Sequence, residues 1–106
     1  MSGIITGNVQ SVSVISVALT PALVAANTTA EQTFTVGGVR ASDKISSVSK
    51  PTTQAGLGIV GVRVSADNTV AITFSNNTGG NITPTAGEPY SLFLWRPDST
   101  QAGFNV

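Results

Sequence analysis

The sequence predicts an all-β protein, an antiparallel immunoglobulin-like β-sandwich of about seven short strands. Alternating apolar and polar runs recur about every ten residues, and Gly-, Pro- and Asn-rich turns separate them. No stretch has the period of a convincing helix. A small β-barrel is the alternative, because a closed sheet gives a similar pattern. The 106 residues suffice for one core, and we divide them into an N-terminal arm, residues 1–10, and one sandwich domain, residues 11–106.

The clearest element is a β-hairpin over residues 59–75. Apolar side chains occupy alternate positions on both sides of a polar turn: Val60, Val62 and Val64 before it, and Val70, Ile72 and Phe74 after it. A period of two directs each row toward a core. Asp67 and Asn68 in the turn bond their own backbone and tolerate positive φ. The hairpin carries no reactive group, so we interpret it as a scaffold.

Three further runs precede this hairpin. Residues 12–20 alternate until the phase slips at Ile15 to Val17, where we expect a bulge or a crossing between sheets. Residues 30–36 form the next strand, with Phe34 as its core anchor. Residues 44–50 are rich in Ser and have Lys at both ends, which is typical of an edge strand.

The last strand, residues 88–96, is apolar on both faces. Tyr90, Leu92 and Leu94 alternate with Ser91, Phe93 and Trp95. The strand is therefore either buried on both sides or part of an interface. Trp95 and Tyr90 are also candidates for a sugar-stacking platform, whereas the simpler reading places Tyr90 in the core with Trp95 covering it.

Composition excludes several kinds of chemistry. The chain has no Cys and no His, so disulfides, Cys-ligated zinc, thiol nucleophiles and His bases are all excluded. Five basic residues balance five acidic ones, and only 9% of residues are charged, against about 25% in a typical domain. Such a surface suits packing against other protein copies. The basic residues are scattered, so we expect no nucleic-acid partner.

We expect neither a membrane partner nor a catalytic site. Residues 12–26 are too short and too polar to span a bilayer. Because the first basic residue is Arg40, we also expect no signal peptide and synthesis in the cytoplasm. The acidic residues, Glu31, Asp43, Asp67, Glu88 and Asp98, lie mostly in turns or at strand starts. We therefore predict no catalytic residue, no metal site and no cofactor, hence no enzyme.

Several segments resemble a known family. They are residues 17–22, 24–36, 50–59, 63–74 and 82–88. Together they are similar to small β-sandwich proteins of tailed bacteriophage virions, some of which are head decoration (cement) proteins, and the resemblance extends over residues 17–95. It implies a non-enzymatic virion protein that binds the outer surface of the major capsid protein lattice and stabilises the head, often as a homotrimer. Tail and baseplate proteins use the same small fold, so a location in the tail or baseplate is an alternative to the head.

Candidate interface residues come from the arm, the loop before the hairpin and the last strand. They are Ile4, Ile5, Gln54, Leu57, Ile59, Phe93, Trp95 and Arg96. They are ranked by exposed apolar character. The alternative function is an immunoglobulin-like module that binds carbohydrate or a host surface.

Overall fold

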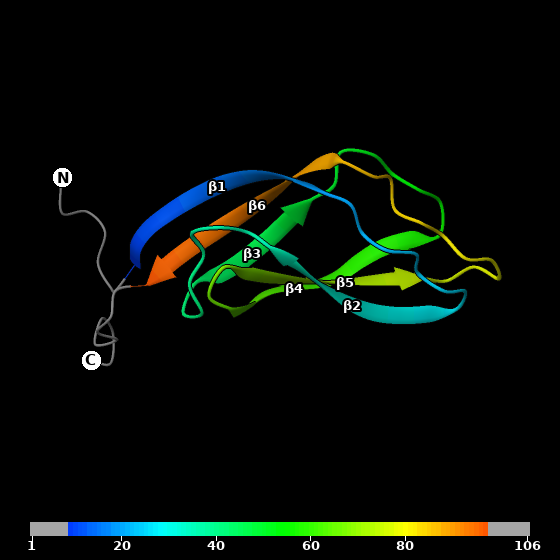
Figure 1. Ribbon diagram of the computed structural model, residues 1–106, viewed down its shortest axis with the longest axis horizontal. Coiled ribbons are helices and arrows are strands. Elements are labelled where there is room, and N and C mark those ends of the chain that lie inside the picture. The colour runs from blue at the N-terminus through cyan, green and yellow to red at the C-terminus, as the bar shows by residue number, and fades with distance from the viewer. Residues whose placement is uncertain (1–8, 98–106) are drawn as a thin grey trace.

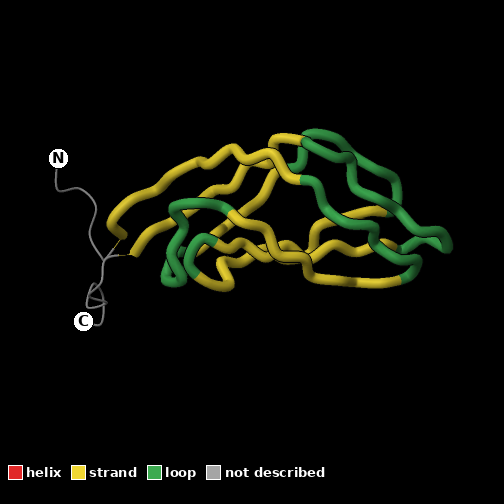
Figure 2. The backbone as a smooth tube through the Cα atoms, viewed as in Figure 1, coloured by secondary structure: helices red, strands yellow, loops and turns green. Residues whose placement is uncertain are grey.

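The structure is a computed structural model that describes residues 9–97 and contains six β-strands (Figure 1). The strands are β1 (Val9–Leu19), β2 (Thr28–Thr35), β3 (Lys44–Ser49), β4 (Leu57–Ala66), β5 (Thr69–Asn76) and β6 (Glu88–Pro97). Loops and turns connect them, and no helix occurs within this range (Figure 2). The described part of the chain thus has six strands where about seven were expected.

The strands form two antiparallel three-stranded sheets, in the orders β1-β6-β3 and β2-β5-β4. No ladder between described residues joins the sheets, so the fold is a β-sandwich and not the barrel alternative. β3 is an edge strand, as its Ser and Lys content predicts. β6 is the central strand of its sheet, because β1 and β3 flank it on both sides.

The core lies between the two central strands, β5 and β6. Their inward side chains are all buried: Val70, Ile72 and Phe74 from β5, and Tyr90, Leu92 and Leu94 from β6. Burying an apolar side chain of this size stabilises a fold by about 1.5–3 kcal/mol. Sequence alternation predicts both rows, and the structure confirms them.

The turn between β4 and β5 confirms the predicted hairpin and also holds a second loop. Asn68 has a φ of 59°, a left-handed conformation that Asn tolerates better than most residues. Its Oδ1 accepts a hydrogen bond from Gly38 N at 2.9 Å, and Asp67 Oδ1 accepts one from Ala41 N at 2.8 Å. The connection between β2 and β3 is thereby fixed against this turn.

Val60 does not face the core, although alternation predicts that it does. The ladder shifts register between Ile59 and Gly61, which makes Val60 the extra residue of a β-bulge, 63% exposed. A bulge reverses the phase of alternation. Ile59 therefore takes the inward position and packs on the core with Val62 and Val64.

β1 is regular where the sequence predicts an irregularity. Its register with β6 does not shift over Ser11–Leu19, and the only shift lies before Ser11. The apolar residues instead occupy both faces: Val12 and Val14 are exposed, whereas Ile15 and Val17 pack on the core. The predicted bulge or sheet crossing at Ile15 to Val17 is therefore wrong.

Candidate interaction face

The outward face of the β1-β6-β3 sheet carries one charged residue among the described positions. Register and alternation place these side chains on it: Val12, Val14, Ser16 and Ala18 from β1, Lys44, Ser47 and Ser49 from β3, and Pro89, Ser91, Phe93 and Trp95 from β6. Lys44 is the charged one and lies on an edge strand. Because charged residues are depleted from the cores of protein interfaces, this face is a candidate interaction surface.

Four apolar side chains of β1 and β6 on this face form what we call the outer patch: Val12, Val14, Phe93 and Trp95. In the β1–β6 ladder Val12 lies opposite Trp95, and Val14 lies opposite Phe93. Opposite residues in an antiparallel pair have Cβ atoms about 4.5–5.5 Å apart, so the patch is contiguous. Val12 is 46% exposed, Val14 72% and Phe93 37%, and Trp95 is half-buried. Contiguous exposed apolar side chains are typical of binding surfaces.

The two aromatic rings of the outer patch are stacked and held in place. Phe93 and Trp95 lie two residues apart on β6, and their ring centroids are 5.6 Å apart with planes inclined by 29°. Trp95 Nε1 donates a hydrogen bond to Ser46 Oγ at 3.1 Å. Ser46 is the extra residue where the β3–β6 register shifts between Ile45 and Ser47, and bulges re-aim side chains in this way. The stack is therefore an ordered anchor, which lowers the entropy cost of binding.

Tyr90 belongs to the opposite face of β6. It is fully buried in the core, as the simpler sequence reading predicts, and its hydroxyl has no hydrogen-bond partner among the described residues. Burial raises the pKa of this phenol, and the Glu88 carboxylate adds to the effect. Because Trp95 lies on the outward face, it neither covers Tyr90 nor forms a platform with it. Its aromatic neighbour is Phe93.

Sequence reasoning missed two members of the outer patch, Val12 and Val14. Their signal was present in the phase slip at Ile15 to Val17, which marks a strand with apolar residues on both faces. The same slip also fits an irregular backbone. Recognising the patch also required the ladder that sets β1 beside Phe93 and Trp95.

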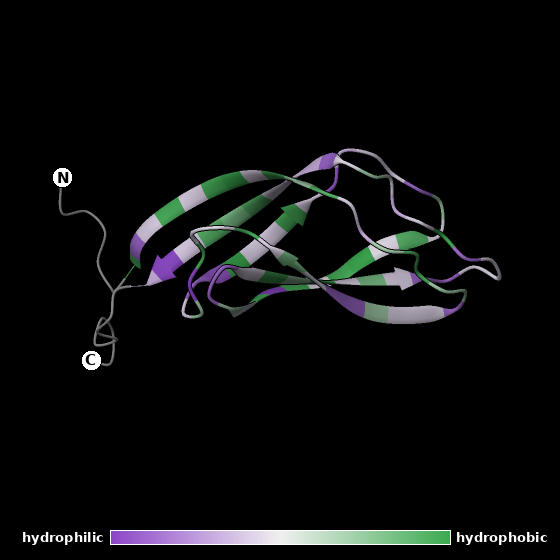
Figure 3. Ribbon diagram, viewed as in Figure 1, coloured by the Kyte–Doolittle hydropathy of each residue, from purple (hydrophilic) through white to green (hydrophobic). Residues whose placement is uncertain are grey.

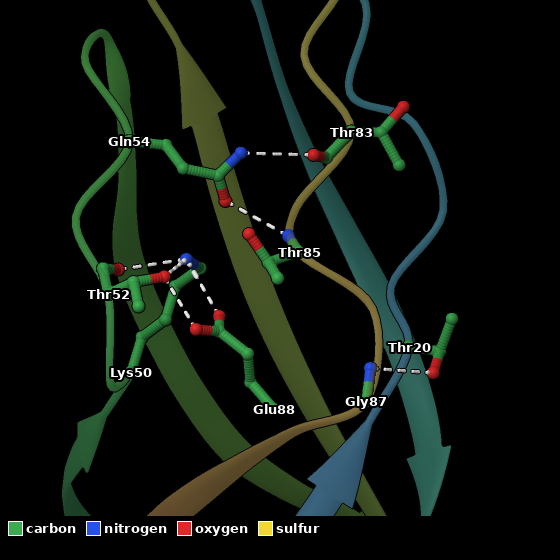
Figure 4. Close-up of polar contacts among 8 residues, drawn as sticks. All are labelled: Thr20, Lys50, Thr52, Gln54, Thr83, Thr85, Gly87 and Glu88. Carbon is green, nitrogen blue, oxygen red and sulfur yellow. Dashed lines mark hydrogen bonds and ion pairs between the residues drawn. The ribbon is translucent and has the colours of Figure 1, made fainter.

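Three candidate residues in and after the loop before β4 serve the fold itself. Gln54 Nε2 donates to Thr83 O at 3.1 Å, and its Oε1 accepts from Thr85 N at 3.0 Å, so it links two connections (Figure 4). Leu57 and Ile59 are half-buried and pack on the core. All three line a shallow groove of about 230 Å³ beside Val48, Lys50 and Thr52. They do not join the outer patch.

Arg96 is engaged in an ion pair and is not a free interface cation. Its Nε and Nη2 donate to Asp43 Oδ1 and Oδ2 at 3.0 and 2.8 Å, and Nη2 also donates to Gly38 O at 2.8 Å. Asp43 is buried and also accepts from Arg40 N at 2.9 Å. The Arg96 hydrogen bonds hold the pKa of Asp43 below its ordinary value, with a smaller contribution from Arg40 N. This cluster fixes the end of β6 to the loop before β3.

A second ion pair lies at the start of β6. Lys50 Nζ is 3.0 Å from Glu88 Oε1, and both side chains are about nine-tenths buried (Figure 4). The Thr52 hydroxyl donates to Glu88 Oε2 at 2.5 Å and accepts from Lys50 Nζ at 3.2 Å. The Thr52 hydrogen bond, followed by Lys50, lowers the pKa of Glu88. All three groups are occupied with one another, so the geometry supports a structural role.

The two remaining carboxylates of the described residues are also occupied. Glu31 and Arg63 form a two-point ion pair at 2.9 Å on the outward face of the β2-β5-β4 sheet, and its hydrogen bonds lower the pKa of Glu31. The Asp67 carboxylate accepts a hydrogen bond from Ala41 N. No group of three acidic side chains that fits a metal ion occurs within residues 9–97.

Ile4 and Ile5 lie outside the described residues. Of the predicted arm, Val9 and Gln10 are the first residues of β1. Of the candidate interface residues, Phe93 and Trp95 are the two that the fold brings together on an exposed face, with Val12 and Val14 beside them. The chain matches no protein-family model, no curated protein and no solved structure.

Proposed function

We propose that this chain is a non-enzymatic bacteriophage virion protein that decorates the head by binding the outer surface of the major capsid protein lattice. The observation that carries the proposal is the outer patch, with its ordered Phe93–Trp95 stack on a sheet face that has one charge. The resemblance of residues 17–95 to phage virion proteins supports it from the sequence. Aromatic residues that are fixed before binding are the usual centres of protein interfaces.

Decoration of this kind works by mass action. A protein that binds the assembled lattice and not its separated subunits stabilises the assembly by about 2.7 kcal/mol per site at a free concentration of 100 times Kd. Many copies on one shell add these contributions. The resemblance implies three copies around each three-fold or quasi-three-fold position, and contacts among neighbouring copies would add avidity.

Binding to heads tests the proposal. Heads of the source phage that lack this protein are mixed with the purified chain, sedimented and imaged by electron microscopy. We expect saturable density on the outer capsid surface, from which the number of copies per site is counted. Density on the tail or baseplate would assign the chain to that structure, and binding to neither would overturn the proposal.

A matched pair of variants tests the role of the outer patch. Trp95→Ala removes the ring that packs on Phe93 and should weaken head binding at least about tenfold, because central aromatic anchors contribute about 2 kcal/mol or more. Val60→Ala is the control, since Val60 is also exposed but lies on the other sheet. Equal binding by both variants would exclude the outer patch as the contact.

A carbohydrate- or host-surface-binding module is the second candidate. The partly exposed stack of Phe93 and Trp95, with hydroxyls of Ser46 and Ser47 nearby on β3, is the observation that favours it. A glycan array separates the two functions. Specific glycan binding that is lost in Trp95→Ala would support this candidate over decoration.

A further inference from the structure

β1 has fewer features that block strand addition than the other edge strands, and its one register shift lies at its first residues, between Val9 and Ser11. β2 carries Glu31, β3 carries Lys44 and a bulge at Ser46, and β4 carries Arg63 and two bulges. β1 spans eleven residues without a charge, a glycine or a proline. Its ladder is regular over Ser11–Leu19. Natural sheets place charges and bulges on their edges because an uncovered regular edge binds further strands.

The free side of β1 has no partner among the described residues. β6 pairs with one side of the strand, and no other described strand pairs with the opposite side (Figure 1). An edge strand leaves about half of its backbone N–H and C=O groups without a ladder partner. Hydrophobic bands alternate along this strand (Figure 3), and Val14 at its middle is 72% exposed. The edge thus offers both hydrogen-bonding groups and apolar side chains.

From this edge we propose that β1 of one copy pairs antiparallel with β1 of a second copy across a two-fold axis at Val14. Val14 is the middle residue of Val9–Leu19, so this register pairs the regular stretch from Ser11 to Val17 of one copy with the same stretch of the other. The two sheets then form one six-stranded sheet in the order β3-β6-β1-β1-β6-β3, and the two outer patches lie on the same face.

As a partner for β1, the β1 strand of a second copy fits better than any of the other edge strands, β2, β3 or β4. In the Val14-centred register Val14 meets Val14, Val12 meets Ser16, and Ser13 meets Ile15 across the axis, so no charged residue faces another. Pairing with β2, β3 or β4 would instead introduce a charged residue, Glu31, Lys44 or Arg63 respectively, and in β3 and β4 also a bulge. The chain's formal net charge of 0 also removes long-range repulsion between copies.

The mass of the full chain in solution tests the pairing. Light scattering over a concentration series should approach twice the 10.7 kDa mass of one chain. Val14→Lys should return the protein to one chain, because two ammonium groups would meet at the axis, and its melting temperature should show that it folds. Val60→Lys is the control on the β4 edge and should leave the pair intact. A single-chain mass for the unmodified protein, or a three-chain mass, would overturn the proposal.

Engineered cysteines test the register, since the chain has no Cys of its own. Val14→Cys should form a disulfide-linked pair on mild oxidation. Ser16→Cys shares the face and the exposure, but it lies four residues from its own copy across the axis, about 13 Å along the strand. That separation exceeds the reach of a disulfide, so no cross-link is expected. Equal cross-linking of both variants, or of neither, would refute the proposed register. The pair is proposed for the free protein in solution, whereas the three-copy arrangement that the resemblance implies concerns the assembled head. Capsid binding is measured separately, so the pairing can be refuted without refuting the proposed function.

Discussion

Asn76 is the last residue of β5, and its buried side chain links two connections at this end of the sandwich. Replacing Asn76 tests how much these buried hydrogen bonds stabilise the fold. The side chain is 1% exposed. Its Nδ2 donates to Val24 O at 3.0 Å and to Gly80 O at 2.8 Å. Its Oδ1 accepts from Thr78 N at 2.9 Å and from Thr78 Oγ1 at 2.7 Å. One amide thus joins the connection before β2 to the loop after β5.

The size of the stability loss in Asn76→Ala depends on which of the former hydrogen-bond partners can bond to water instead. A hydrogen bond contributes about 1 kcal/mol net, and a buried group left without a partner costs about 1–3 kcal/mol. Four hydrogen bonds are lost, of which water replaces part of those to exposed Gly80 and half-buried Thr78, while Val24 O keeps its bond from Ile82 N at 3.0 Å. We therefore expect a loss of about 2–4 kcal/mol in the free energy of unfolding. This corresponds to a decrease of roughly 10–20 °C in Tm for a domain of this size.

Urea unfolding monitored by Trp95 fluorescence, with thermal unfolding beside it, measures this loss. Asn77→Ala is the matched control: Asn77 is exposed, its side chain forms no hydrogen bond among the described residues, and its backbone bond to Gly56 O survives the change. It should change stability by less than about 0.5 kcal/mol. A loss below about 1 kcal/mol for Asn76→Ala would refute the reasoning, because it would mean that the buried amide is not the link described.

Three further predictions concern stability. Gly56→Ala should destabilise the fold, because Gly56 has a φ of 82° and an added Cβ would collide with Thr78 Cγ2, whereas Gly79→Ala meets no neighbouring atom and should be nearly neutral in the same urea assay. Phe74→Ala should cost about 3–5 kcal/mol on urea unfolding, since it empties the centre of the core, and a loss below about 1 kcal/mol would contradict that placement. The folded-state pKa of Asp43 lies below its ordinary value of 3.8. The contribution of the Asp43 carboxylate to folding stability is therefore present above pH 3.8 and is lost as the pH falls through the folded-state pKa. Asp43→Asn should lower the urea midpoint near neutral pH and make it less dependent on pH below about 4; an unchanged acid dependence would contradict the role of this carboxylate.

Most of the core was predictable from the sequence because it depends on neighbours along one strand. The alternation of Val70, Ile72 and Phe74 places them on one face wherever the strand packs. The turn at Asp67 and Asn68 was predictable for the same local reason. The bulge at Val60 was not, because it depends on how β4 aligns with β5.

The candidate site was predictable only in part. Phe93 and Trp95 stand out as large apolar residues on the second face of a strand that already has a core face. The internal hydrogen bonds of Gln54 and Arg96 were not predictable, because their polar partners, Thr83 and Asp43, are distant in the sequence. Side chains that look available along the chain are occupied once these segments meet.

The sequence by itself determined that the chain is built of β-strands, where most of them lie and which rows of residues fill the core. These properties follow from a period of two and from turn chemistry, both of which act between near neighbours. The tertiary structure decided that β6 is central, that β1 lies at an edge and that Val12 and Val14 join Phe93 and Trp95. The physical reason is that strand order and register are set by hydrogen bonds between distant segments, and the periodicity of a single strand does not specify its partner.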